Sequence, residues 1–548
     1  MKEKIASIMS LIIPSPFSQE ETLSFHYGLP SGPPLIARTG VPWKQPWGPE
    51  AYSPKRKLQV VGKHPIAVPG LWHGQVGPKI LDILDRFKVK WHTIDVVRIA
   101  YEYNDSCAPP APVTIWIAVG LGTLSGNEGN TVACQCQEVL NSFGLNDVEV
   151  CIRGSKYYQE AVSGLDASGF YFDPTAELRL CKPSISAVGF PISTNICPTA
   201  EGSLGLFFTN GIDTSIVYFL TARHAVIPQT THNNNKLYEC KNQSLPHHDV
   251  TIFGENHLKA IRMHIGEIGL LVKHDQRRIN RLEGRENEAA VKEREEGQSN
   301  IRRMHKALER LEKVYDYTFK FWHSAQGQSI GAVTLSPPIT FSIGDNQWTE
   351  DWAIGQVDAN KIDVDTFCPN TLDLGFEFTW LQLNSLMKVN SESPPSFEYP
   401  EGCVLPIRGI VSDAEIRNPG DKDENGDPCI TVLKRGKTTG LTVGRVNNVD
   451  SFVRKYWDDG TVDTSMELPV FGHESKNPSK RSKPFSKPGD SGSAVVDGKG
   501  RVIGMIIGGV GFTTASDVTY VTPAEFLFDQ IRSHGINPNI DFTLKATA

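Results

Sequence analysis

From about residue 180 onward the chain is a succession of short apolar runs separated by glycine- and proline-rich turns. Examples are SIVYFLTA (215–222), CITVLKRG (429–436) and RVIGMII (501–507). Runs of this length, rich in Val and Ile and bounded by turn residues, are typical of β-strands. A long series of them predicts a β-barrel or β-sandwich architecture.

The chain before this point has a different pattern. We expect residues 1–70, rich in Pro, Gly and Trp, to form an irregular N-terminal arm. Residues 71–178 are expected to form a compact α+β domain of unknown role. Its expected elements are a helix with Ile80, Leu81, Leu84 and Phe87 on one face, strands over 93–103, 113–122 and 147–154, and a helix over 130–144.

A charged segment interrupts the strand pattern. Residues 276–316 predict a helical hairpin, with its turn near Gly297. Spacings of 3, 4, 3 and 4 form a coiled-coil-like seam of Ile301, Met304, Leu308, Leu311 and Tyr315. Two interpretations remain open, namely a solvated structural insertion and a surface that binds a protein partner.

Charge and cysteine content restrict the function classes. The formal net charge of -7 gives no electrostatic argument for binding nucleic acid or an anionic membrane. No apolar run approaches the ~20 residues that span a bilayer, and the N-terminal apolar core, residues 8–13, is shorter than that of a secretion signal. Cys134 and Cys136 lack a second pair with metal-ligand spacing. We therefore expect a cytoplasmic protein with free thiols and no metal.

The strongest functional motif is the string Gly489-Asp490-Ser491-Gly492-Ser493 before a strand-like run. Glycines on both sides allow a sharp turn and the close approach of a substrate. The motif predicts Ser491 as a nucleophile and the backbone N–H groups of Gly489 and Ser491 as an oxyanion hole.

A serine hydroxyl needs a general base, and that base needs an acid that orients it. Among the 15 histidines, only His224 lies directly after a strand-like run, in YFLTARHAV (218–226). Asp351 opens the strand-like run DWAIGQV (351–357) and is the predicted acid. Glu267 is the rival acid because it also leads an apolar run, while Asp249 and Asp275 are weaker alternatives.

The order His224, Asp351, Ser491 in these settings resembles the chymotrypsin-like (trypsin-fold) serine peptidases. Residues 432–446 and 517–531 resemble the strand pair that opens their second barrel and their closing strand and helix. The chain is similar to trypsin-like peptidase domains of large fungal proteins. The resemblance implies a double β-barrel over residues 179–541, with the helical hairpin inserted in it and the active site between the barrels.

This resemblance also implies proteolysis of a protein or peptide substrate by a Ser-His-Asp triad, without a cofactor. It implies a substrate pocket that includes Phe485, Ile507, Gly508 and Gly509. Phe485 stands where relatives that prefer Arg or Lys carry an acid, which argues against a basic preference. We find no activation site that would create a new N-terminus to pair with Asp490, so we expect Asp490 to be held in another way.

Two other functions are weighed against the peptidase. The peptidase fold can serve as a binding or signalling module that does little chemistry, with the hairpin and the N-terminal domain making the contacts. A non-peptidase acyl hydrolase would carry a GxSxG elbow between a strand and a helix, whereas Ser491 precedes a strand-like run.

Overall fold

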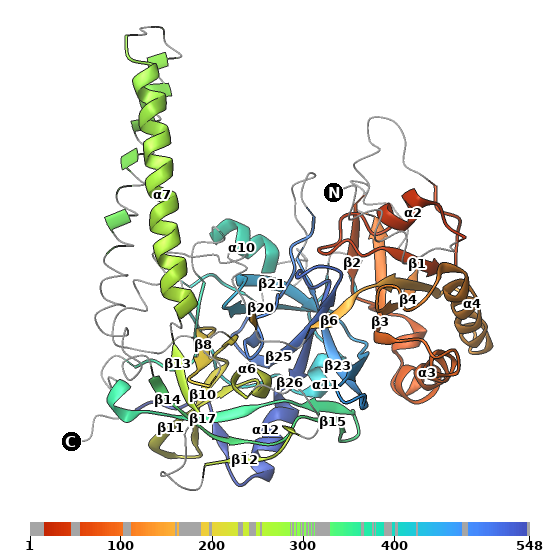
Figure 1. The fold of residues 1–548 in the computed structure, drawn as a ribbon. Helices are drawn as coiled ribbons and strands as arrows, with labels where there is room; N and C mark the ends of the chain where they lie inside the picture. Colours follow the sequence, from red (N-terminus) through yellow and green to blue (C-terminus); the bar gives the residue numbers. More distant parts are fainter. Residues whose placement is uncertain are drawn as a thin grey trace.

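In the computed structural model the described residues form several β-sheets, and strands outnumber helices (Figure 1). It describes residues 16–44, 55–101, 111–158, 162–163, 188–196, 200–227, 234–240, 248–252, 255–284, scattered positions between 287 and 312, 329–362, 367–374, 378, 380–387, 397–400, 404–423, 426–473 and 481–544. No helix in these ranges is long and apolar enough to cross a bilayer.

The N-terminal region forms a sheet with helices packed beside it. Its elements are α2 (Gln19–Ser24), β1 (Leu35–Arg38), β2 (Arg56–Gln59), the short turns η1 (Pro65–Ala67) and η2 (Trp72–Val76), α3 (Gly77–Arg86), β3 (Trp91–Tyr101), β4 (Val113–Val119), α4 (Gly126–Ser142) and β5 (Glu149–Gly154). The α+β pattern expected for residues 71–178 is present. The expectation of an irregular arm over residues 1–70 is wrong in part, since β1 and β2 pair with β5 and β3.

Local sequence explains the crossover in this region. Ser125 caps α4, because its hydroxyl accepts a hydrogen bond from Glu128 N while the Glu128 carboxylate accepts one from Ser125 N. Every residue of β4 is buried, as expected for a central strand covered on both faces. The helix α4 therefore connects β4 to its parallel neighbour β5.

Six strands of the C-terminal region form a closed barrel. In chain order the strands of this region are β20 (Ile430–Gly436), β21 (Gly440–Val446), β22 (Ser451–Tyr456), β23 (Val462–Gly472), β24 (Ala494–Asp497), β25 (Val502–Gly511) and β26 (Val518–Pro523), followed by α12 (Ala524–Ser533). Pairings run β23–β21–β20–β24–β25–β26 and return from β26 to β23. We call these six strands the closed barrel.

A second sheet, which we call the open sheet, is formed mostly by strands from the middle of the chain. Its strands are β7 (Val162–Ser163), β8 (Pro191–Thr194), β9 (Ala200–Ser203), β10 (Leu206–Asn210), β11 (Asp213–Thr221), β12 (Tyr238–Glu239), β13 (Asp249–Ile252), β14 (Ser329–Ser336), β17 (Ala353–Val357) and β27 (Pro538–Asn539). Within the described ranges, its end strands β7 and β27 do not pair with each other. Of the two barrels that were expected, the described strands therefore form one closed barrel and one open sheet.

Smaller elements complete the fold. They are β15 (Thr340–Ile343), β16 (Trp348–Glu350), η5 (Ala359–Lys361), β18 (Thr371–Asp373), α10 (Trp380–Met387), β19 (Val404–Pro406) and α11 (Asp413–Arg417). One apolar cluster contains Leu220 of β11, Val496 of β24 and Phe528 of α12. Because this cluster joins the open sheet to the closed barrel, it sets how the two meet.

The N-terminal sheet is continuous with the C-terminal strands, since β3 pairs with β22. A buried ionic network crosses the same boundary, in which Arg153 of β5 bonds Asp95 of β3 at 3.0 Å and Asp517 at 3.2 Å. All three side chains are fully buried. Tyr520 and Ser451 donate further hydrogen bonds to Asp95. The partner groups satisfy charges that would be costly to bury alone.

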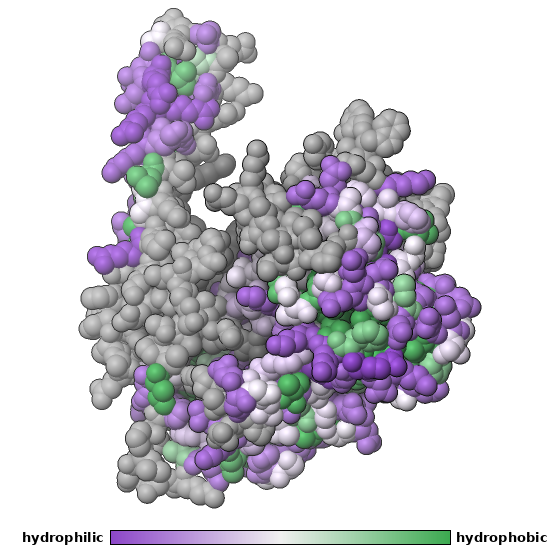
Figure 2. Space-filling model, turned by 45° about the vertical axis from the view of Figure 1, so that its right-hand side comes forward, coloured by the Kyte–Doolittle hydropathy of each residue, from purple (hydrophilic) through white to green (hydrophobic). Residues whose placement is uncertain are grey.

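The charged segment is helical, but its bounds differ from those expected. Helix α7 (Glu255–Arg281) begins well before residue 276 and projects from the body of the molecule (Figure 1). The chain then turns at residues 282–284, where Gly284 has a φ of 81°. Hydrophilic side chains cover the projecting end (Figure 2).

The predicted turn at Gly297 is wrong, because Gly297 has helical backbone. A Cβ at Gly297 would lie 3.0 Å from the Ile279 side chain, so the returning helical residues pack on α7. The glycine permits this close approach instead of making a turn. Of the predicted seam, Met304, Leu311 and Tyr315 lie outside the described residues.

Candidate active site

His224 and Asp351 come together at one end of the open sheet. His224 lies in the short helix α6 (Arg223–Val226), directly after β11. Asp351 is fully buried between β16 and β17, rather than within a strand as expected. Because Thr221 of β11 pairs with Ala353 of β17, the two segments are held side by side.

The contact between them is short and specific. His224 Nδ1 lies 2.6 Å from Asp351 Oδ2, and the His224 backbone N–H donates to Asp351 Oδ1 at 3.2 Å. A carboxylate at this position makes Nδ1 the protonated nitrogen and leaves a lone pair on Nε2. The Nε2 atom is buried and has no hydrogen-bond partner among the described residues. The imidazole is therefore oriented with a free base on its other side.

The rival acid, Glu267, belongs to helix α7, and nothing is described of its side chain. The rival Asp249 lies at the start of β13, where its carboxylate accepts a hydrogen bond from Asn195. Asp275 lies beside His274 on α7. The described contact with His224 thus belongs to Asp351.

The serine motif forms a tight loop before β24. Gly489 and Gly492 have φ angles of 98° and 90°, in the left-handed region that favours glycine. The N–H groups of Gly489 and Ser491 donate no hydrogen bond within the described part of the chain. Ser491 itself is 5% exposed. The loop thus has the two unused amides that an oxyanion hole requires.

The serine loop packs directly against the segment that carries His224. A Cβ on Gly492 would collide with Ser203 O and Thr221 Oγ1 and would lie 3.1 Å from Ala222 N. The Ser203 N–H also donates to Ser491 O at 2.8 Å. Ser491 therefore lies beside the residues that lead into His224, although no hydrogen bond between their side chains is present among the described contacts.

Asp490 is held by an internal ammonium group. Lys434 Nζ of β20 lies 3.3 Å from Asp490 Oδ2, and both side chains are fully buried. Backbone N–H groups of Thr438 and Lys487 and the Thr439 hydroxyl also donate to this carboxylate, at 2.8, 3.0 and 2.7 Å. The lysine supplies the positive charge, so no new N-terminus is needed to balance Asp490.

The predicted pocket residues lie in and beside the closed barrel. Phe485 is buried in the barrel core, under Gly444, and Ile507 is buried on β25. Gly508 and Gly509 follow on β25, and a Cβ on Gly508 would lie 2.7 Å from the carbonyl oxygen of Tyr158. The pocket strand is therefore covered by another part of the chain.

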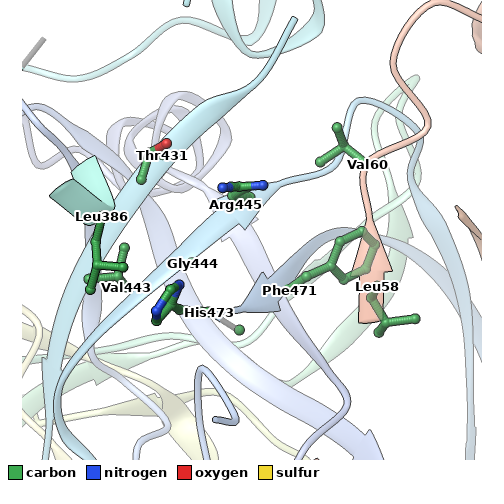
Figure 3. Close-up of a pocket in the computed structure, with 10 residues that line it drawn as sticks. Leu58, Val60, Leu386, Thr431, Val443, Gly444, Arg445, Phe471 and His473 are labelled. Carbon is green, nitrogen blue, oxygen red and sulfur yellow. The ribbon is translucent and has the colours of Figure 1, made fainter. Parts of the chain in front are cut away.

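A separate pocket of about 380 Å³, including space open to solvent, is lined by residues of β20, β21 and β23 and by residues of β2 and α10 (Figure 3). Its lining residues are Leu58, Val60, Leu386, Thr431, Val443, Gly444, Arg445, Phe471, Gly472 and His473. The residues of the serine and histidine motifs are not among them. This pocket and the candidate active site are different places.

A buried acid lies near the His224–Asp351 pair. Burial raises the pKa of Glu467 to about 8, and the negative charges of Asp351 and Asp450 add to the increase. The carboxyl contacts the hydroxyls of Thr349 and Ser465. Glu467 is therefore protonated near neutral pH, which avoids a second buried negative charge beside Asp351.

Arg223 anchors the short helix α6, which also contains His224, to neighbouring segments of the chain. It donates to Ser336 O at 2.8 Å and to Lys236 O. Burial lowers the pKa of Arg223 to about 10, so its guanidinium stays charged at neutral pH. The arginine ties α6 to β14 and thereby holds the histidine in place.

Sequence reasoning missed Lys434, Ser203 and Gly202. Ser203 Oγ donates to Gly489 O and accepts from Lys437 N, both at 3.0 Å. Gly202 leaves the space that Ala225 occupies. No motif identifies these residues, because their roles depend on strands that meet in space.

The described residues contain no group of three or more metal-ligating side chains. Cys134 is exposed and Cys136 is buried, and both are free thiols. His64 lies 3.1 Å from an Asp147 carboxylate oxygen, and His73 lies 3.2 Å from one of Asp450. Comparison with known protein families and with curated proteins gave no match.

Proposed function

We propose that the protein is a serine endopeptidase with Ser491 as nucleophile, His224 as general base and Asp351 as the acid that orients it. The observation that carries this proposal is the 2.6 Å contact of His224 Nδ1 with buried Asp351, while the Ser491 loop packs against the residues that lead into His224. Such a pair polarises a hydroxyl and stabilises the imidazolium that forms.

The reaction is acyl transfer. Ser491 Oγ attacks a peptide carbonyl carbon while His224 Nε2 takes the hydroxyl proton. The N–H groups of Gly489 and Ser491 stabilise the oxyanion, each contributing ~3 kcal/mol in the transition state. His224 then gives the proton to the leaving amine, and water hydrolyses the ester.

The remaining expectations are part of the same proposal. The substrate is a protein or peptide, and no cofactor takes part. The free thiols of the described cysteines support a reducing compartment such as the cytoplasm. The projecting helical segment is the proposed contact surface for a protein partner.

One observation favours the alternative of a binding or signalling module. The side chains of Ser491 and His224 are not hydrogen-bonded to each other in the described structure. Catalytic hydrogen bonds are often long before substrate binds, so the same arrangement also fits a peptidase without its substrate.

Labelling with a fluorophosphonate probe tests the proposal. We expect labelling of the wild type and a complete loss in Ser491→Ala and His224→Ala. Ser533→Ala, which changes an exposed serine on α12, controls for unspecific labelling. Labelling that persists in Ser491→Ala, or its absence in folded wild-type protein, would contradict the peptidase.

A further inference from the structure

The turn that leads into Ser491 contains one of the two proposed oxyanion-hole amides. Asp490 N donates to Lys487 O at 3.0 Å, which closes a β-turn over residues 487–490. Gly489, the third residue of this turn, has a φ of 98°. The N–H of Gly489 belongs to the central peptide of the turn, which joins Pro488 to Gly489. The orientation of this peptide therefore decides where the N–H points.

The φ of Gly489 identifies the turn as type II. The third residue has a φ of about +80° in type II and about −90° in type I. The mirror-image types need a positive φ at the second residue, and proline, with its φ fixed at about −65°, excludes them. The two dihedral angles that flank the central peptide differ by about 150° and 170° between types I and II. A flip of this one peptide therefore converts one type into the other.

The residues of the turn do not by themselves require type II. Proline fits the second position of both types, and glycine adopts positive and negative φ about equally readily. A contact from outside the turn distinguishes the two forms. Thr438 Oγ1 donates to Pro488 O at 2.7 Å, and within the described part of the chain it is the one group that bonds this oxygen.

This hydrogen bond sets the direction of the Gly489 N–H. A trans peptide points its C=O and its N–H in opposite directions, so the N–H points away from Thr438. In the type I form the peptide would present its carbonyl oxygen instead, and the partial negative charge of that oxygen repels an oxyanion. The Ser491 amide is held differently, because Asp490 O accepts a backbone hydrogen bond from Ser493 N at 3.1 Å. Of the two amides, the one at Gly489 thus depends on a side chain.

The hairpin loop between β20 and β21 brings Thr438 to this position. Gly436 pairs with Gly440, which leaves a three-residue loop, and Gly440 has the positive φ of 62° that closes such loops. A Cβ on Gly436 would lie 2.6 Å from Asp490 Oδ1, so this glycine lets the hairpin approach the serine loop. The Thr438 N–H donates to the same carboxylate oxygen at 2.8 Å. The hydroxyl therefore reaches Pro488 O from a fixed backbone.

We propose that Thr438 is a positioning residue of the oxyanion hole, whose hydroxyl stabilises the type II turn over residues 487–490 and so directs the Gly489 N–H at the substrate oxyanion. This inference rests on the proposed peptidase function and adds a residue that acts through a neighbouring peptide rather than on the substrate. Loss of the hydroxyl should slow the reaction and leave the His224–Asp351 pair unchanged.

Two variants of Thr438 test the inference through the rate of fluorophosphonate labelling, since a negative oxygen also develops when Ser491 attacks phosphorus. Thr438→Val keeps the branched shape and the backbone N–H but removes the hydroxyl. We expect labelling to be between about tenfold and about 10³-fold slower, the upper limit being the loss of one oxyanion-hole donor. Thr438→Ser keeps a hydroxyl and should be labelled within about threefold of the wild-type rate.

The pH dependence of labelling separates a misdirected peptide from damage to the triad. The pH at which the rate reaches half of its maximum should be the same in Thr438→Val and in the wild type, because His224 and Asp351 are untouched. Thr461→Val is the matched control. It removes an exposed hydroxyl that bonds Asp459 between β22 and β23, and it should be labelled at the wild-type rate.

A double-variant cycle tests whether Thr438 acts through the turn. Gly489→Ala disfavours a positive φ and therefore the type II form. Because both changes act on the same peptide, adding Thr438→Val to Gly489→Ala should slow labelling by less than about threefold more. Independent effects would multiply instead.

The outcomes separate the inference from the proposed function. Labelling of Thr438→Val at the wild-type rate overturns the inference and leaves the peptidase standing. An equal loss in Thr438→Ser, a shifted pH profile in Thr438→Val, or losses that multiply in the double variant also overturn it, because the hydroxyl would then not act on this peptide. Folded wild type that is not labelled overturns both the inference and the peptidase.

Discussion

The closed barrel and the open sheet each carry one half of the candidate site, and they hold it in different ways. In the closed barrel, buried Asp490 accepts hydrogen bonds from β20, from the following turn and from its own loop. In the open sheet, Asp351 accepts one hydrogen bond from the backbone N–H of His224 and lies 2.6 Å from its ring Nδ1. The two buried carboxylates therefore have different structural roles.

The difference separates a carboxylate that stabilises the fold from one that orients a side chain of the candidate site. Asp490 fixes the shape of a loop, because its partners come from several backbone segments. Asp351 fixes the protonation and orientation of one ring. The closed barrel should therefore respond to mutation mainly through stability, and the open sheet mainly through activity.

Asp351→Asn gives the largest expected effect. An amide of the same shape keeps the packing but can no longer hold the imidazole in the reactive tautomer, which lowers kcat by about 10⁴-fold in such triads. We expect the fluorophosphonate labelling rate to fall to a similar extent. The free energy of unfolding should stay within about 1 kcal/mol of the wild-type value. The exposed Asp358→Asn, at the end of β17, is the matched control. A labelling rate within tenfold of the wild type would break the comparison.

Lys434→Met comes next. It leaves Asp490 buried without its cation, and removing one partner of a buried pair costs about 3–5 kcal/mol of unfolding free energy. Chemical denaturation measures this loss, and Lys499→Met, at an exposed position, should stay within about 0.5 kcal/mol of the wild type. The double variant Lys434→Met with Asp490→Asn should recover most of the loss. A single variant as stable as the wild type would refute the assigned role.

Glu467→Gln changes how stability depends on pH, and it sharpens the boundary between the two halves. The folded pKa of about 8 lies above the ordinary 4.5, so the contribution of Glu467 to stability is fully present below pH 4.5. That contribution falls by up to about 1.4 kcal/mol per pH unit between pH 4.5 and pH 8, and it is lost above pH 8.

We therefore expect the unfolding free energy of Glu467→Gln to rise relative to that of the wild type between pH 5 and pH 8, and the difference to stay constant above pH 8. Thermal unfolding across this interval measures the difference, and the exposed Glu138→Gln serves as the control. Parallel pH profiles for wild type and Glu467→Gln would show that Glu467 does not change its charge in this range.

Much of the fold follows from local patterns. The strand-like runs at 215–222, 429–436 and 501–507 correspond to β11, β20 and β25. Hydrophobic periodicity and turn residues act within a few positions, so they can be read one segment at a time. The helical turn was misplaced because Gly297 serves close packing against Ile279, and a glycine in sequence does not reveal which use it has.

By itself, the sequence determined the strands, the helices and the sharp glycine turns around Ser491, because backbone preferences and apolar spacing are local. Only the tertiary structure decided that Lys434 meets Asp490 and that β3 joins β22. These contacts join residues far apart in the chain. They form only when the sheets pack and bring buried charges and strand edges together. No local sequence pattern specifies that packing.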